Sequence, residues 1–198
     1  MDVIEICQDQ IDTLLKLDED HFNDLKSKRI APAKLQETLV AFANSDGGDL
    51  YVGIEDKAEQ GERVIGFQEP EEANGILATL LEGTVPAVEN LGWEFLDTNG
   101  RGLILHFSIP KSPKVHYTAG GDCFIRVNAQ KLKIKGEKVT QLGYSKGAEL
   151  YERKAVEDVD VDEMAECEKL AAYMGQVKSS LDVKVFLQKQ RLLTKKED

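Results

Sequence analysis

The 198-residue sequence contains few cysteines and histidines, three of each, and they are scattered. Widely separated cysteines, odd in number, offer neither a disulfide framework nor the CxxC pairs of a zinc site. The histidines form no ligand cluster, so we expect no structural zinc, and this use of cysteine predicts a reducing, cytoplasmic location. The residues concerned are Cys7, Cys123, Cys167, His21, His106 and His116.

Long apolar runs are also missing. No stretch approaches the ~20 apolar residues that a membrane-spanning helix requires, and the acidic start MDVIEICQDQ lacks the basic-then-apolar order of a secretory signal. With 41% hydrophobic and 31% charged residues, the composition is that of a soluble globular chain. Its length allows one ordinary core with a small appendage, or two small domains, and we predict no membrane partner.

Basic residues are outnumbered, since the net charge is −11. This balance opposes simple nucleic-acid binding, which draws its affinity from lysine and arginine contacts to phosphate. The distribution is uneven, however: residues 101–150 hold nine basic and three acidic residues, and no acidic residue lies between Leu25 and Gln36, where Lys26, Lys28, Arg29 and Lys34 cluster. Such asymmetry is typical of a polyanion-binding face, or equally of a solvated surface of mixed charge.

The most informative stretch is QETLVAFANSDGGDLYVGIED, residues 36–56. Helical spacing of apolar residues gives way within six residues to the alternation of a strand over residues 50–54. The joint, residues 44–49, contains Gly47 and Gly48, which permit positive φ and a close approach of backbone or ligand. The joint is either a phosphate- or metal-facing turn or simply a helix cap leading into a strand.

Elsewhere helices mix with short strands and show no strict βαβ repeat, so we predict an α+β fold with a sheet covered mainly on one face. Pro32 suits the first turn of the central helix. The other expected helices cover residues 2–17, 71–82, 164–174 and 181–193. The other expected strands cover residues 64–67, 93–96 and 103–109, together with a hairpin that pairs 115–118 with 123–127. Residues 17–28, LDEDHFNDLKSK, are expected to form a strand or a short extended segment.

Three ordered motifs resemble the Schlafen AlbA_2 family, also called divergent AAA-4, a domain of bacterial regulators and eukaryotic Schlafen proteins thought to bind nucleic acid. AFANSDGGDLYVGIED resembles its central motif. Glu19 followed by Asp24-Leu25-Lys26 resembles its Glu-x4-Glu-Phe-Lys motif, with Asp24 and Leu25 replacing Glu and Phe. The stretch 123–128, CFIRVN, resembles its arginine-bearing strand.

The resemblance implies a mixed-sheet α+β domain over residues 1–145. Residues 146–198 would then form an acidic linker and a partial helical extension, which begins a winged-helix-like region of a longer protein. It also implies a non-catalytic, DNA-binding domain of a bacterial transcriptional regulator that forms a cytoplasmic homodimer and needs no cofactor. The residues expected to contact nucleic acid are Lys26, Lys28, Arg29, Arg126, Lys131, Lys133 and Lys135, with the phosphate-facing turn of Asn44, Ser45, Gly47 and Gly48.

The spacing of the last three lysines is itself open to two interpretations. Lys131, Lys133 and Lys135 alternate with Leu132 and Ile134, so in a strand they would line one face. That arrangement suits contacts along a phosphate backbone. It is equally the means by which an edge strand avoids aggregation.

Two other functions remain open. Some Schlafen proteins are metal-dependent endoribonucleases, and the resemblance places their carboxylates at Glu19, Asp24 and Asp56, or less readily Glu55, where Mg²⁺ or Mn²⁺ would bind. The third hypothesis is a protein-interaction module with an acidic surface, favoured if Lys131, Lys133 and Lys135 lie away from the first basic cluster. A P-loop ATPase is not supported, because the GxxxxGK motif is missing.

Overall fold

The structure is a computed structural model that describes residues 3–57, 62–147, 162, 164, 166–176 and 182–189. The chain forms two compact units, Met1–Tyr151 and Glu152–Asp198. Within the described residues, no helix is both long enough and apolar enough to cross a membrane.

A five-stranded mixed sheet organises the first unit, with the strand order β1-β4-β5-β3-β2. The central strand β5 runs antiparallel to β3 and β4, while the edge strands β1 and β2 run parallel to β4 and β3. Combined with its helices, this sheet confirms the α+β class. The strands are β1 Val3–Glu5, β2 Asn23–Lys26, β3 Gly48–Val52, β4 Gly92–Asp97 and β5 Leu103–Ile109.

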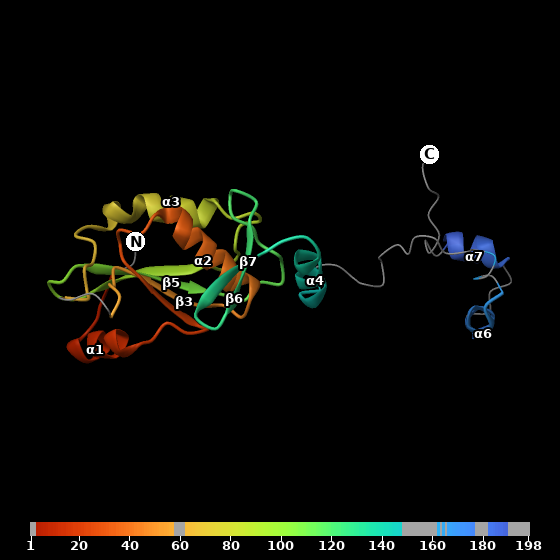
Figure 1. Cartoon of the computed structure of the whole chain (residues 1–198), viewed down its shortest axis with the longest axis horizontal. Helices are drawn as coiled ribbons and strands as arrows, with labels where there is room; N and C mark the ends of the chain where they lie inside the picture. Colours follow the sequence, from red (N-terminus) through yellow and green to blue (C-terminus); the bar gives the residue numbers. More distant parts are fainter. Residues whose placement is uncertain are drawn as a thin grey trace. The chain divides into compact units, whose positions relative to one another are not determined.

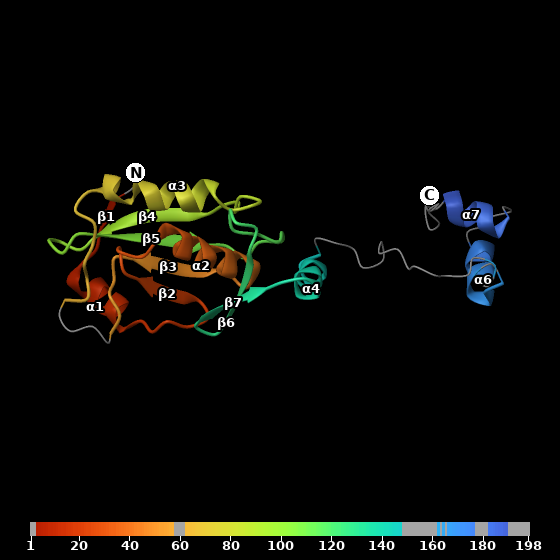
Figure 2. The same ribbon diagram turned by 45° about the horizontal axis from the view of Figure 1, so that its top comes forward.

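Helix α2, Pro32–Asn44, lies at the centre of the unit, and Figures 1 and 2 show it with α3, Asn74–Glu82, over the same face of the sheet. Pro32 opens α2 as predicted, and residues 38–44 are all buried. Leu39 and Phe42 pack with Phe95 and Phe107 of the sheet in the main core. The central motif therefore supplies both the helix and the strand β3 that face each other across this core.

The opposite face of the sheet is covered in part by α1, Gln8–Lys16 (Figure 1). Ile11 and Leu14 of α1 pack with Leu25, Leu96 and other residues in a second apolar cluster. The expected helix over residues 2–17 was wrong at its start, where Val3–Glu5 form β1 and pair in parallel with β4. Helical spacing cannot reveal this pairing, because the partner strand lies about 90 residues away.

A separate two-stranded sheet packs against α2 and consists of β6, Cys123–Val127, and β7, Gln130–Ile134. The expected hairpin between 115–118 and 123–127 was therefore wrong, and Tyr117 forms only an isolated bridge with Val85. The observed turn at residues 128–129 has two residues, and Asn128 has φ +53°. Asparagine tolerates the left-handed conformation that a two-residue hairpin requires.

Two further predictions were incomplete. The stretch 64–67 contributes isolated bridges at Val64 and Phe67 rather than a strand, and residues 71–82 divide into a 3₁₀ turn, η1 Pro70–Ala73, and α3. Helix α4, Glu137–Ser145, was not predicted, and Gly143 is its one buried residue.

The second unit contains α6, Glu168–Gln176, and α7, Val183–Lys189. The rings of Tyr173 and Phe186 meet edge to face, 6.2 Å apart, beside the buried Met174. Most of the acidic run 157–163 and the end of the helix expected over 181–193 lie outside the described residues. The division after residue 145 and the winged-helix-like continuation stay predictions.

Candidate nucleic-acid interface

The guanidinium of Arg126 lies inside the first unit, between β2 and α2. Its Nη1 is 3.1 Å from Oδ2 of Asp24, and the two side chains are 1% and 4% exposed. Nε and Nη2 donate to the carbonyl oxygen of Asp20, and Nη2 also donates to that of Asn23. The guanidinium also stacks over the ring of Phe42, 4.3 Å from its centroid. Arg126, predicted to contact nucleic acid directly, therefore connects β6 to β2 and α2.

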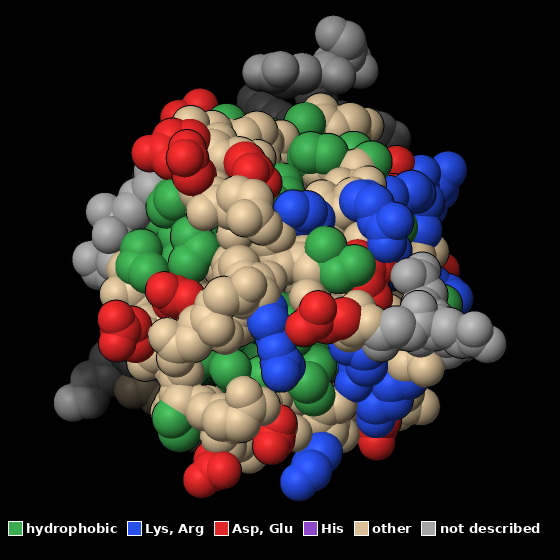
Figure 3. Space-filling model, turned by 90° about the vertical axis from the view of Figure 1, so that its left-hand side faces the viewer, with side chains coloured by type: hydrophobic (Ala, Val, Ile, Leu, Met, Phe, Trp, Pro, Cys, Tyr) green, Lys and Arg blue, Asp and Glu red, His purple; other side chains and the backbone are tan. Residues whose placement is uncertain are grey.

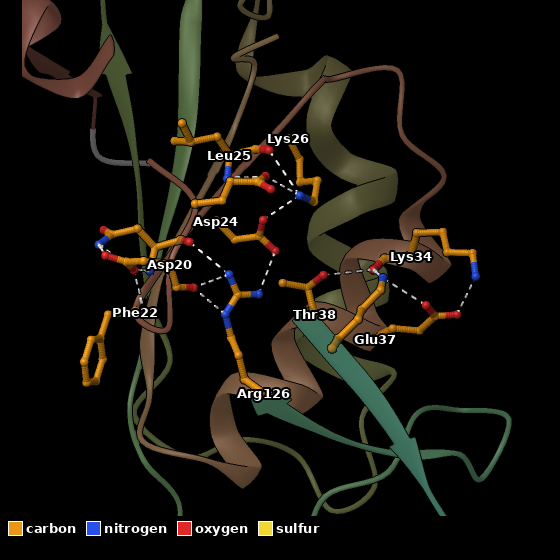
Figure 4. Close-up of polar contacts among 12 residues, drawn as sticks. Asp20, Phe22, Asp24, Leu25, Lys26, Lys34, Glu37, Thr38 and Arg126 are labelled. Carbon is orange, nitrogen blue, oxygen red and sulfur yellow. Dashed lines mark hydrogen bonds and ion pairs between the residues drawn. The ribbon is translucent and has the colours of Figure 1, made fainter. Parts of the chain in front are cut away.

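Lys26 lies between two of the predicted carboxylates. Asp24 and Lys26 project from the same face of β2, as the alternation predicts, and Nζ lies 2.5 Å from both Asp24 Oδ1 and Glu19 Oε1 (Figure 4). Burial opposes the ammonium form, but the nearby carboxylates outweigh it and raise the pKa of Lys26. Burial, assisted by the neighbouring Asp24, raises the pKa of Glu19.

This arrangement does not fit a divalent cation. Asp24 already faces Lys26 with one oxygen and Arg126 with the other, and the ammonium of Lys26 lies where a cation shared with Glu19 would lie. Within the described part of the chain, no group of three or more His, Cys, Asp or Glu residues is placed to hold a metal ion.

The third predicted carboxylate lies nearby, in a hollow of about 410 Å³ that Glu19, Lys26, Arg29 and Asp56 help to line. Its neighbour Glu55 is only 3% exposed; Ser27 Oγ donates to its Oε1, and Arg29 lies 3.1 Å from its Oε2. Glu55 therefore has a supporting role beneath this hollow, whereas Asp56 is exposed at its edge. The fold thus brings Glu19, Lys26, Arg29 and Asp56 together from two parallel strands and the loops that adjoin them.

Lys131 of the β6–β7 hairpin contacts the N-terminal half of α2. Lys131 Nζ donates to the carbonyl oxygen of Lys34 and lies 2.9 Å from Glu37. Glu37 also pairs with Lys34 (Figure 4). Burial opposes the ionised form of Glu37, yet these two lysines lower its pKa. Lys133 pairs instead with Asp122. The second basic segment is therefore joined to the first through Lys131.

The two other lysines predicted to contact nucleic acid, Lys135 and Lys28, differ in how they are held. Lys135 is exposed just beyond β7. Lys28 donates to the carbonyl oxygen of Gly66 and lies over the ring of Phe67. A lysine held against the protein body in this way is a weaker candidate for a phosphate contact than the exposed Arg29 or Lys34.

The polar turn after α2 is directed largely inward. Asn44 is 2% exposed; its Nδ2 donates to the carbonyl oxygens of His116 and Phe124, and its Oδ1 accepts the N–H of His116. Ser45 Oγ accepts the N–H of Arg126 at 2.8 Å. Asn44, predicted to face a phosphate, therefore connects α2 to β6 and to the segment before it.

Gly47 and Gly48 permit close packing of backbone. A Cβ on Gly47, at φ +79°, would lie 2.6 Å from the carbonyl oxygen of Ile109; one on Gly48 would lie 2.5 Å from that of Phe22 and from the Phe42 ring. Both contacts are too close for any other residue. The glycines therefore allow α2, β3 and β5 to approach one another closely. This favours the interpretation of the turn as a helix cap leading into a strand over that of a phosphate- or metal-facing turn.

Sequence reasoning missed the loop that precedes β2. Asp20 Oδ1 accepts the N–H groups of both Phe22 and Asn23. Burial works against the ionised form, but these hydrogen bonds lower the pKa of Asp20. The aspartate two residues before an exposed aromatic is a turn signal that sequence reasoning could have used. The loop is also held by a hydrogen bond from Arg126, which lies about 100 residues away in sequence and could not have been found in this way.

Comparisons with known proteins show the family to which the chain belongs. No curated protein matches the sequence significantly. Among solved structures, the crystal structure of the DIP2311 protein from Corynebacterium diphtheriae is similar, with a TM-score of 0.49 and 16% sequence identity; the similarity covers 90% of this chain and 35% of that one. The family described as "Schlafen, AlbA_2" matches residues 19–135, which hold all three sequence motifs, and the chain therefore belongs to the Schlafen AlbA_2 family.

Proposed function

We propose that the first unit is a non-catalytic nucleic-acid-binding domain, with DNA as its first candidate ligand, in a transcriptional regulator of bacterial type. Membership of the Schlafen AlbA_2 family supports association with nucleic acid. We further propose a cytoplasmic location, since Cys7, Cys123 and Cys167 are free thiols.

The observation that carries the proposal is the contact between the two basic segments. Lys131 of β7 meets Lys34 of α2, and Arg126, directly opposite Lys131 in the hairpin, meets Asp24 beside Lys26. Residues about 100 positions apart thus form one basic region along β2, α2 and β7. The protein-interaction hypothesis was favoured if Lys131, Lys133 and Lys135 lay apart from Lys26, Lys28 and Arg29. The contact of Lys131 with Lys34 supports nucleic-acid binding for this lysine, whereas Lys133 pairs with Asp122.

Ion pairs with acidic side chains do not prevent such binding. The Lys34 side chain is 60% exposed and pairs with the partly exposed Glu37, and such surface ion pairs contribute little stability, typically about 0–1 kcal/mol. A phosphate can therefore replace the carboxylate partner. Charge is also segregated on the surface: on the face in Figure 3 most Lys and Arg side chains lie to the right, and the largest acidic group lies at the upper left.

The test is a gel assay of the purified chain with labelled duplex DNA and structured RNA, with and without Mn²⁺. We expect salt-sensitive retention without cleavage. Replacing Lys131, Lys133 and Lys135 together by Ala should weaken binding uniformly across sequences and reduce the salt dependence, because each phosphate contact contributes about 0.9 to the slope.

The matched control removes the same charge elsewhere in the first unit, through alanine at Lys16 in α1, Lys57 after β3 and Arg101 in the β4–β5 turn. It should bind as the unchanged chain does. Equal binding by the Lys131, Lys133 and Lys135 variant would remove this region from the proposal.

The metal-dependent endoribonuclease is retained as the second candidate because Glu19 and Asp56 share one hollow. This function requires the ammonium group of Lys26 to move away from the carboxylates of Glu19 and Asp24. In the same gel, Mn²⁺-dependent cleavage that disappears in Asp56→Asn would establish it and displace the non-catalytic proposal. Cleavage that persists in the variant would contradict the assignment of Asp56.

A homodimer that joins two basic faces across a two-fold axis is part of the proposal. Sedimentation equilibrium measures it directly, and a monomer at micromolar concentration would contradict it. If the chain neither retains nor cleaves nucleic acid, the protein-interaction hypothesis replaces this one.

A further inference from the structure

We propose that Phe22 is a base-stacking residue and that the ligand therefore contains unpaired nucleotides. The inference rests on the proposed function and specifies its ligand class. Phe22 lies in the loop before β2, and 52% of it is exposed to solvent. Figure 4 shows its ring pointing away from the cluster of Arg126 and Asp24.

The loop that carries Phe22 is firmly held on both sides. Asp20 Oδ1 accepts the N–H of Phe22 at 2.7 Å, and the N–H of Asp49 in the neighbouring strand donates to the Phe22 carbonyl oxygen at 2.7 Å. Arg126 donates to the carbonyl oxygens of Asp20 and Asn23, which flank the ring position. An aromatic ring presented to water on so fixed a backbone loses little conformational entropy when a ligand binds.

The surroundings of the ring suit a phosphate backbone. The His21 ring meets Phe22 edge to face, 4.9 Å away. His21 and Lys111 share one carboxylate, that of Asp46, at 2.9 and 2.8 Å, and the Lys111 side chain is 62% exposed. Lys111 is therefore available to a phosphate next to a base that stacks on Phe22.

The chemistry of the side chain points to unpaired bases. A phenyl ring carries no hydrogen-bonding group, so it offers a π-face that any base can stack on, without sequence preference. In a duplex, both faces of an internal base are already stacked on neighbouring bases. The geometry thus favours single strands, loops or frayed ends over continuous duplex.

The experiment compares three ligands of equal length, measured by fluorescence anisotropy: a single-stranded DNA, the same strand with abasic sites at its centre, and a blunt duplex. The variants are Phe22→Leu, which keeps an apolar side chain but has no π-face, and Phe22→Tyr, which keeps the ring. Thermal melting by circular dichroism confirms that both variants are folded.

We expect Phe22→Leu to weaken binding of the single strand at least about fivefold, the lower limit for loss of one stacked base. Binding of the abasic strand should not change, and Phe22→Tyr should retain most of the affinity. Equal affinity of Phe22→Leu and the unchanged chain for the intact strand would overturn the inference while leaving the proposed function intact. Failure of the unchanged chain to bind any of the three ligands would overturn both.

A direct optical readout distinguishes stacking from an indirect effect. Phe22→Trp places an indole at the ring position, and its fluorescence should be quenched when the single strand binds. Val85→Trp, at another exposed apolar position, serves as the control and should show no quenching. Binding without quenching of Phe22→Trp, or loss of self-association in Phe22→Leu with nucleic-acid binding unchanged, would assign the ring to a protein contact and reject the inference.

Discussion

Arg126 and Asp24 form an almost completely buried ion pair, with Nη1 and Oδ2 3.1 Å apart, that connects the β6–β7 hairpin to strand β2. Four further hydrogen bonds or ring contacts hold the guanidinium. An arginine in this position stabilises the surface that carries the basic residues, even though the guanidinium does not itself reach solvent.

Arg126→Met should lower the free energy of unfolding by up to about 3–5 kcal/mol, because the buried carboxylate of Asp24 loses one of its two ion-pair partners and keeps Lys26. Urea denaturation followed by circular dichroism measures this change. Lys114→Met breaks the exposed pair with Glu89 and should leave the free energy of unfolding nearly unchanged, because solvent screens such a pair. Similar small losses of stability in both variants would show that the buried ion pair does not stabilise the connection between the β6–β7 hairpin and β2.

Gly48→Ala should be strongly destabilising, because the new Cβ would lie 2.5 Å from both the Phe22 carbonyl oxygen and the Phe42 ring. Gly75→Ala is the matched control, since its Cβ meets nothing within 4 Å and alanine improves helix propensity by up to about 1 kcal/mol. Melting temperatures should therefore shift in opposite directions. A tolerated Gly48→Ala would mean that the joint between α2 and β3 relaxes easily.

Asn44→Ala should lower the free energy of unfolding by at least about 1–3 kcal/mol, the cost of one buried polar group left unsatisfied. The amide satisfies backbone groups of His116 and Phe124 that are otherwise enclosed. The exposed amide of Gln141 in α4 provides the comparison, and Gln141→Ala should be nearly neutral. If Asn44→Ala instead weakened nucleic-acid binding at unchanged stability, the turn would be phosphate-facing after all.

The buried imidazole of His116 makes stability depend on pH. Burial lowers its pKa below the ordinary 6.5, and the lysines 114 and 146 lower it further against the opposing hydrogen bond to Pro86. Below pH 6.5 the unfolded chain therefore binds a proton that the folded chain resists, so stability falls as the pH falls. His116→Asn should flatten the slope of unfolding free energy between pH 5 and 6.5, and an unchanged slope would assign it to other groups.

Local patterns predicted those elements whose partners lie close along the chain. Pro32 and the apolar spacing after it located α2, and the strands expected over residues 93–96 and 103–109 correspond to β4 and β5. Val3 and Ile4 fitted a helix equally well, because only pairing with β4 makes them a strand. Likewise, neither the hairpin partner of β6 nor the position of α4 follows from apolar spacing.

In the candidate site too, local sequence patterns predicted neighbouring residues but not contacts between residues distant in sequence. Alternation placed Asp24 and Lys26 on one face of β2, as found. It did not show that Arg126 and Asn44 are enclosed, because their partners lie 72 to 106 residues away in sequence. A motif identifies residues that a domain needs, but burial decides whether they support a surface or form it.

The contact of Arg126 with the carbonyl oxygens of Asp20 and Asn23 imposes an order on biosynthesis. When the ribosome has released β2, α2 and β3, the loop that carries Phe22 still lacks the guanidinium that supports it. Only after residue 126 has left the exit tunnel, and β6 has paired with β7, can the loop take its final form. A nascent chain would therefore acquire its sheet before the loop that carries Phe22 is fixed.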